Sequence, residues 1–185
     1  MVLDLRAGVP APALILGFAQ SLGEDIEAAL SIYPDAVLFG VNRAAKLYRC
    51  QHLVSLDKHK IPEFIPDYPI TVHAGRFGGV KQQHGPKDYI DCYWPHLQTG
   101  GTSGSSGWLA AKIAVKLGHA PVVMCGCPID NSAHVEPDTG YHQSLWNNPK
   151  QFGTCRDYIV SDTAYHEFVF SMSGWSREFL GYPRG

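Results

Sequence analysis

Residues 100–126 decide the fold that we expect: Gly100-Gly-Thr-Ser-Gly-Ser-Ser-Gly107, then Trp108-Leu-Ala-Ala-Lys-Ile-Ala-Val-Lys-Leu-Gly118, then Pro121-Val-Val-Met-Cys-Gly126. They read as a small hydroxyl-rich loop, a largely apolar helix and a strand. Glycine lets the backbone approach a ligand closely, and free N–H groups at a helix N-terminus favour a phosphate or another anion. The stretch therefore predicts either an anion-binding loop before a helix or an ordinary flexible surface loop.

Apolar runs of strand length alternate with helical patterns along the rest of the chain. Pro12-Ala-Leu-Ile-Leu-Gly17 precedes a helical pattern, and Ser21 and Glu24 have the spacing of a capping box at its start. Such alternation predicts an α/β fold, with a single Rossmann-like domain over residues 1–185 and a mostly parallel sheet that has helices on both faces. Further expected elements are strands within 35–41, 52–57, 69–74, 89–94 and 122–125, helices over 42–48 and 163–180, and irregular insertions near 75–100 and 128–161.

Composition limits the classes of partner. The chain has 185 residues, 45% of them hydrophobic, and its 15 Lys and Arg against 17 Asp and Glu give a formal charge of −2. Because the charges form no basic run, we expect no nucleic-acid partner. No window approaches the ~20 apolar residues of a membrane span, and the N-terminus lacks the pattern of a secretion signal. We therefore expect a cytoplasmic protein.

Five cysteines, an odd number without paired C-x-x-C spacing, argue against a disulfide framework and a structural zinc site. We expect reduced packing residues and no metal-ligating set. Ligands of open parallel sheets bind beyond the carboxyl ends of the strands. The residues expected at that edge are Gly17 to Ser21, Asn42, Asp57, the 102–106 loop and Asp130.

Three blocks of the chain resemble one group of nucleotide-binding proteins. They are Leu14-Ile-Leu-Gly-Phe-Ala-Gln-Ser-Leu22, Phe39-Gly-Val-Asn-Arg-Ala44 with Ser55-Leu-Asp57, and Gly101-Thr-Ser-Gly104 through Cys125-Gly-Cys-Pro-Ile-Asp130. In order and spacing they resemble the Rossmann-like group of bacterial (Campylobacter-type) sialyltransferases and 6-hydroxymethylpterin pyrophosphokinase-like proteins. The resemblance implies a nucleotide-dependent transferase that moves a sugar from a nucleotide-activated donor to an acceptor hydroxyl.

The resemblance also implies roles for individual residues. Asn42 would bond the base or sugar, and His134 or His142 would be the general base that deprotonates the acceptor, a role suited to the ordinary pKa of histidine. From local sequence alone, Ser21 and Asn42 are equally typical of helix N-caps, and Asp57 of a turn. The other expected nucleotide contacts are Gly17, Ser21, Asp57 (to a ribose hydroxyl or Mg²⁺), Thr102, Ser103, Gly104 and Ser105.

Two other functions fit the same residues. One is a pyrophosphokinase-like enzyme with Mg²⁺ on Asp57 or Asp130 and ATP phosphates on the Gly/Ser loop; without a Walker-type motif, an ordinary P-loop kinase is excluded. The other is a nucleotide-binding or interaction module without turnover, because Phe18-Ala-Gln20 replaces the Gly-Pro type of loop found in the relatives. In each case the partner is a small nucleotide or nucleotide-sugar ligand, and a homo-oligomer is compatible with the aromatic residues near 89–94.

Overall fold

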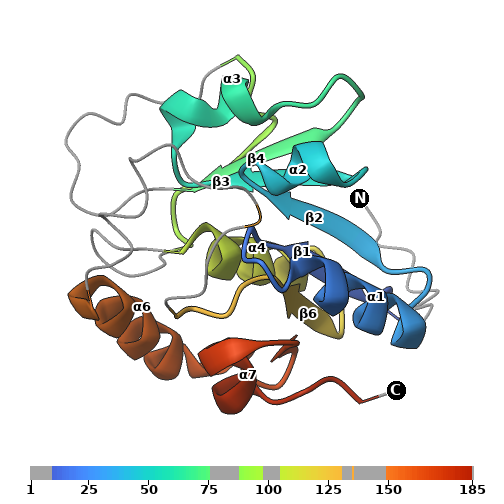
Figure 1. The fold of residues 1–185 in the computed structure, drawn as a ribbon. Coiled ribbons are helices and arrows are strands. Elements are labelled where there is room, and N and C mark those ends of the chain that lie inside the picture. Colours follow the sequence, from blue (N-terminus) through green and yellow to red (C-terminus); the bar gives the residue numbers. More distant parts are fainter. Residues whose placement is uncertain (1–9, 76–87, 98–104, 131–134, 136–148, 185) are drawn as a thin grey trace, which may run out of the picture.

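The computed structural model describes residues 10–75, 88–97, 105–130, 135 and 149–184, and they form one layered α/β unit (Figure 1). Every neighbouring strand pair in its single sheet is parallel. The predicted α/β Rossmann-like fold is therefore confirmed. Within the described ranges the strands are β1 (Ala13–Leu16), β2 (Val37–Val41), β3 (His52–Ser55), β4 (Thr71–Gly75), β5 (Cys92–Trp94), β6 (Val122–Cys125) and β7 (Val169–Ser171).

The strand order reverses at β1. The sheet runs β5-β4-β3-β2-β1-β6-β7, so the chain builds outward from β1 to β5 and then returns to the other side of β1. Leu16, the last residue of β1, pairs with Gly40 of β2 and Cys125 of β6. Such a reversal creates a topological switch point at the carboxyl end of β1, the usual position of ligands in this fold class.

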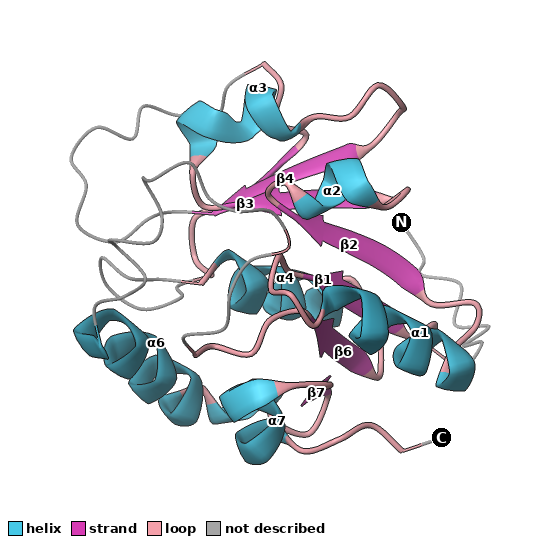
Figure 2. Ribbon diagram, viewed as in Figure 1, coloured by secondary structure: helices cyan, strands magenta, loops and turns pink. Residues whose placement is uncertain are grey.

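Helices cover both faces of the sheet, as Figure 2 shows. Leu14, Leu16 and Val123 pack in a cluster with the helices that follow β1 and β2. Ile15 and Met124 point to the other face and pack with the helix that precedes β6. β1 and β6 are buried throughout, which explains their uninterrupted apolar sequences. The helices are α1 (Leu22–Ile32), α2 (Ala44–Leu47), α3 (Ile61–Phe64), α4 (Ser106–Lys116), α6 (Pro149–Ser161) and α7 (Gly174–Leu180), with 3-10 turns η1 (Lys58–Lys60) and η2 (Thr163–Tyr165).

The single helix predicted over residues 163–180 is wrong. η2, β7 and α7 occupy that range, and Val169 to Ser171 pair with Val122 to Met124 of β6. Gly174, the first residue of α7, has φ +63°, a backbone conformation that glycine adopts without steric cost. The apolar spacing is that of a helix, but an unpaired edge of β6 competes for the same residues. Tertiary pairing therefore overrides the helical period.

The expected irregular insertion over 128–161 contains a helix, since residues 149–161 form α6. Its apolar signal is weak: Cys155 and Ile159 are the buried apolar residues one turn apart on its described part. The insertion near 75–100 contains β5, at the position predicted for a strand. Among the helices that the structure describes, none is long and apolar enough to cross a membrane.

Candidate functional site

The carboxyl edge of the sheet brings together several residues expected there. Asn42 follows β2, Asp57 follows β3, and Ser105 precedes α4. The backbone N–H of Leu56 donates to Ser106 Oγ over 3.1 Å, which ties the N-terminus of α4 to the end of β3. Thr102, Ser103, Gly104, His134 and His142 lie outside the described residues, so their roles stay predictions.

Gly17 is explained by close packing at the switch point. A Cβ on Gly17 would lie 2.2 Å from the carbonyl oxygen of Gly126 and 2.4 Å from Cys127 Sγ. Its N–H donates to the carbonyl of Cys125 over 2.8 Å. The space beside Gly17 is therefore filled by the loop after β6, and a nucleotide contact by this glycine stays a prediction.

Ser21 belongs to a polar network that closes the switch point. Ser21 is the N-cap residue of α1, as predicted, but the predicted capping-box hydrogen bond is wrong: its side chain makes no cap hydrogen bond, and its hydroxyl donates to Asp25 Oδ2 over 3.1 Å. The same carboxylate oxygen accepts from Ser173 Oγ at 2.6 Å and from the Gly126 N–H at 2.8 Å. Asp25 is only 7% exposed. We call these four residues, Ser21, Asp25, Gly126 and Ser173, the switch-point network.

Side chains of α7 and α6 hold the loop after β6 in place. Ser176 Oγ donates to the carbonyl of Cys127 over 2.7 Å. Ile129 has φ +52°, which is strained for a β-branched residue. The guanidinium of Arg156 donates twice to its carbonyl, at 3.0 and 2.8 Å. Protein groups thus satisfy one another beside β1 and β6.

Asn42 has an unsatisfied side chain. It also has φ +52°, in the left-handed region that Asn tolerates better than most residues, and its N–H donates to the carbonyl of Val54 over 3.1 Å. The residue before α2 is Arg43, so Asn42 is not the N-cap. Its Oδ1 is buried and has no hydrogen-bond partner in the structure that the described residues form. An unsatisfied buried acceptor costs about 1–3 kcal/mol.

Lys58 follows a sharp turn at the end of β3. Asp57 has φ −86° and ψ 71°, and the N–H of Lys58 donates to the carbonyl of Leu56 over 3.1 Å, which defines an inverse γ-turn. Lys58 is 7% exposed, and its Nζ lies 4.0 Å from the ring centroid of Tyr93. Of the buried side-chain nitrogen and oxygen atoms described, only Lys58 Nζ and Asn42 Oδ1 lack a hydrogen bond.

The Asp57 carboxylate does not cap the following 3-10 turn. Within the described ranges it makes no hydrogen bond or ion pair, and the side chain is half-buried. It can therefore accept from a ligand hydroxyl or bind a divalent cation. Because no group of three His, Cys, Asp or Glu in the described chain could hold a metal, such a cation would need ligand oxygens as well.

The N-terminus of α4 is capped by the protein itself. Ser105 Oγ accepts from the Trp108 N–H over 3.2 Å. Burial raises the pKa of Cys155 and of Cys127 to about 12. These thiols stay protonated near neutral pH and are poor nucleophiles. All five cysteines are free thiols in the structure.

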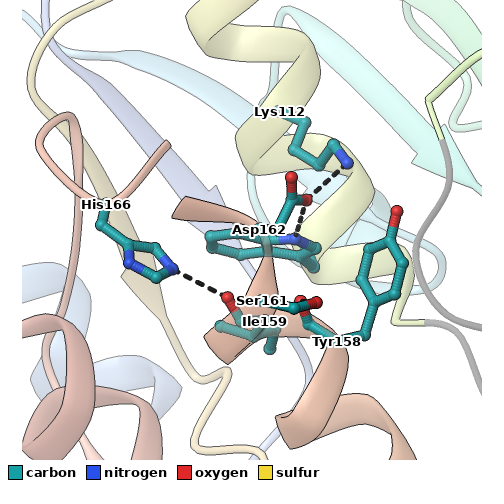
Figure 3. A network of polar contacts seen from close by, with 7 residues as sticks. Lys112, Tyr158, Ile159, Ser161, Asp162 and His166 are labelled. Atoms are coloured by element: carbon teal, nitrogen blue, oxygen red, sulfur yellow. Dashed lines mark hydrogen bonds and ion pairs between the residues drawn. The ribbon is translucent and has the colours of Figure 1, made fainter. Parts of the chain in front are cut away.

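A second buried lysine has a structural partner away from this edge (Figure 3). Lys112 of α4 is 3% exposed, and its Nζ lies 2.6 Å from Asp162 Oδ2. The same oxygen accepts from Trp108 Nε1 over 3.0 Å. Asp162 immediately follows α6, so this pair joins the C-terminal end of α6 to α4. It explains the burial of Lys112 without a ligand.

On the sheet face that α4 covers, Trp94, His73 and His52 form a chain of hydrogen bonds that we call the histidine ladder. Trp94 Nε1 donates to His73 Nδ1 over 3.1 Å, which assigns the proton of neutral His73 to Nε2, 2.9 Å from His52 Nδ1. Burial, and then the neighbouring His52, lower the pKa of His73 to about 4. Burial, and then His119, lower the pKa of His52. Both rings are neutral near pH 7 and act as structural hydrogen-bonding groups.

Sequence reasoning missed Asp25 and Lys58. The role of Asp25 carries no local signal, because two of its three donors come from positions 126 and 173, far away in the sequence. Lys58 had one signal, its place directly after the expected ligand residue Asp57. Comparison with protein-family models, curated proteins and solved structures finds no match to this chain. A functional proposal therefore depends on the geometry of the sheet edge.

Proposed function

We propose that the protein is a nucleotide-dependent transferase, and that the ends of β2 and β3 bind its nucleotide-activated sugar. The observation that carries the proposal is the buried, unsatisfied Oδ1 of Asn42 at the carboxyl end of β2. An all-parallel sheet binds ligands at this edge. A ribose hydroxyl or a base amino group would supply the hydrogen-bond donor that Asn42 lacks.

Asp57 fits a second hydroxyl of the same ligand. It follows β3, the neighbour of β2, and its carboxylate is open to a ligand donor. In the transfer, the acceptor oxygen forms a bond to the anomeric carbon while the bond from that carbon to the nucleotide phosphate breaks. The acceptor proton passes to a histidine, for which His134 and His142 remain the candidates. The nucleotide leaves with the electron pair of the broken bond.

A nucleotide-binding module without turnover is the second candidate. The observation in its favour is the switch-point network, in which Ser21 already bonds to Asp25 and Ser173 is bonded to the same carboxylate. In the relatives that this chain resembles, the loop after the first strand contacts the donor. A loop closed by protein groups leaves fewer contacts for orienting a reaction.

Thermal unfolding with CMP, CDP, UDP, GDP, ATP and their sugar conjugates, with and without Mg²⁺, tests the proposal. A ligand at a hundred times its Kd stabilises the fold by about 2.7 kcal/mol. We expect stabilisation by one nucleotide or nucleotide sugar, and turnover of that sugar donor with an acceptor. Binding without turnover would favour the module, and a Mg²⁺-dependent effect of ATP alone would favour the pyrophosphokinase-like activity. If none of these compounds changes the unfolding temperature, nucleotide binding would be contradicted.

Asn42→Gly sharpens the test, because glycine keeps the left-handed backbone and removes the amide. We expect at least about tenfold weaker nucleotide binding, equivalent to about 1.4 kcal/mol. Lys46→Ala, an exposed change on the adjacent helix α2, is the matched control and should bind like the wild type. Equal affinity of Asn42→Gly and the control would remove Asn42 from the site.

A further inference from the structure

We infer that Lys58 binds the phosphoryl group of the ligand at the carboxyl end of β3. The inference deepens the proposed function, on which it rests for the nucleotide as the source of that phosphate. The anion site itself is derived from Lys58 and its surroundings. Its ammonium is buried, makes no hydrogen bond and lies against the ring of Tyr93.

The backbone fixes Lys58 in this position from two sides. The γ-turn at Asp57 holds its N–H on the carbonyl of Leu56, and Tyr89 Oη donates to the carbonyl of Lys58 over 2.9 Å. The face of Tyr93 attracts the cation but supplies no hydrogen-bond acceptor. The three ammonium N–H donors therefore make no hydrogen bond within the described structure, although the side chain is held in a fixed place.

Lys112 shows how this fold treats a buried lysine that has a structural role. Both lysines are more than nine-tenths buried, but Lys112 has a carboxylate partner at 2.6 Å. Lys58 is equally fixed by the turn at Asp57 and by the ring of Tyr93, but its buried ammonium has no carboxylate or other hydrogen-bond partner. A phosphoryl group would complete the arrangement, since lysine binds phosphate as a point charge.

The neighbouring groups narrow the class of ligand. Asn42 and Lys58 follow adjacent parallel strands, and the Asn42 N–H bonds to β3 through Val54. Asn42 needs a hydrogen-bond donor and Lys58 needs an anion. A nucleotide offers both on one molecule, whereas an inorganic anion satisfies Lys58 alone. The ligand class is therefore a phosphorylated compound with a hydroxyl or amino group near its phosphate.

Lys58→Met tests the inference, because methionine keeps an unbranched apolar side chain and removes the charge. Thermal unfolding is measured with and without inorganic pyrophosphate at matched ionic strength. We expect pyrophosphate to raise the Tm of the wild type and of Lys46→Met, an exposed lysine variant. For Lys58→Met we expect no pyrophosphate effect and an unchanged or higher Tm in its absence, since an uncompensated buried charge has been removed.

The sign of the effect without ligand separates an anion site from a structural lysine. A lower Tm of Lys58→Met together with a retained pyrophosphate effect would overturn the inference, as would no pyrophosphate effect on the wild type. Lys58→Gln repeats the test with a polar neutral side chain; we expect a native circular dichroism spectrum and the same loss of the pyrophosphate effect, and a retained effect would also overturn it.

A second arm identifies the source of the phosphate. The wild type should bind CDP at least about tenfold more tightly than cytidine, and Lys58→Met should reduce that ratio. If no nucleotide binds but a pyrophosphate effect depends on Lys58, the proposed function fails and the anion site stands. If nucleotides bind and neither this ratio nor the pyrophosphate effect changes in Lys58→Met, only the anion site fails.

Discussion

Buried polar groups are hydrogen-bonded to the protein in one half of the carboxyl edge of the sheet and lack such bonds in the other half. Beside β1 and β6, the carboxylate of Asp25 accepts three hydrogen bonds from protein groups, including the N–H of Gly126. Beside β2 and β3, Asn42 Oδ1 and Lys58 Nζ are buried without a hydrogen bond. The first half holds the fold together, and the second half is where we place the ligand.

This difference shows that a switch point marks an edge of the sheet and does not by itself fix which strand ends bind the ligand. We call the part beside β1 and β6 the closed half and the part beside β2 and β3 the open half. Residues of the closed half should affect the free energy of unfolding. Residues of the open half should affect ligand binding and leave that free energy nearly unchanged. Substitutions in each half test this difference.

Asp25→Ala should have the largest effect. It leaves Ser21, Ser173 and the N–H of Gly126 without their shared acceptor, and we expect the free energy of unfolding to fall by about 4 kcal/mol. Urea unfolding followed by circular dichroism measures the change. Glu27→Ala, exposed on the same helix, should change it by less than about 0.5 kcal/mol. Similar effects of the two variants would mean that the network does not hold the closed half.

Lowering the pH tests whether the buried His73 of the histidine ladder is neutral, since its polar groups, like those beside β1 and β6, are hydrogen-bonded within the protein. The folded pKa of His73 is about 4, below the ordinary value of 6.5, so the unfolded chain takes up its proton first as the pH falls. We expect this residue to remove about 3 kcal/mol of unfolding free energy between pH 6.5 and pH 4, with no contribution above pH 7. His73→Gln should flatten that part of the pH profile measured by urea unfolding. An unchanged slope would contradict the buried neutral state.

Gly17→Ala should lower the free energy of unfolding by about 2 kcal/mol, because the new methyl group meets the backbone of Gly126. Gly23→Ala is the matched control: it lies in α1 with nothing within 4 Å of the added Cβ. Alanine favours the helix there, so we expect stabilisation of about 0.5–1 kcal/mol. Thermal unfolding distinguishes the two signs. A neutral Gly17→Ala would show that the loops beside β1 can separate.

Asn42→Gly should have the smallest effect on stability. Removing the unsatisfied acceptor favours the folded state, whereas glycine adds conformational entropy to the unfolded chain. We expect these two contributions to offset one another, so that the free energy of unfolding changes by less than about 0.5 kcal/mol. Urea unfolding measures this value beside the binding loss expected above. A loss of more than about 2 kcal/mol would place Asn42 among the residues that hold the fold.

The sequence predicted the parallel sheet because continuous apolar runs such as residues 12–17 and 122–125 need helices on both faces. It failed over 163–180, where Val169 to Ser171 form an edge strand. Local spacing contains no information about the exposed edge of β6. The same limit applies to Ser21: its sequence spacing fits a cap, but Asp25 and Ser173 engage its hydroxyl.

The candidate site was predicted only in outline. Asn42 and Asp57 were placed at the ligand edge because each follows an apolar strand. The burial of Lys58 depends on a turn and on Tyr93, which comes from a strand two positions away in the sheet. A sequence shows a lysine after an aspartate, but only the packed sheet shows that its ammonium has no hydrogen-bond partner.

One measurement separates the two halves most directly: titration of the ¹⁵N-labelled protein with CMP and, separately, with pyrophosphate, followed by amide chemical shifts. We predict that CMP moves the amides of Asn42, Lys58 and their neighbours, and that pyrophosphate moves those around Lys58. The amides of Ser21, Asp25 and Ser173 should stay in place. Shifts concentrated at these three residues, with Asn42 and Lys58 unmoved, would contradict the assignment of the ligand to the ends of β2 and β3.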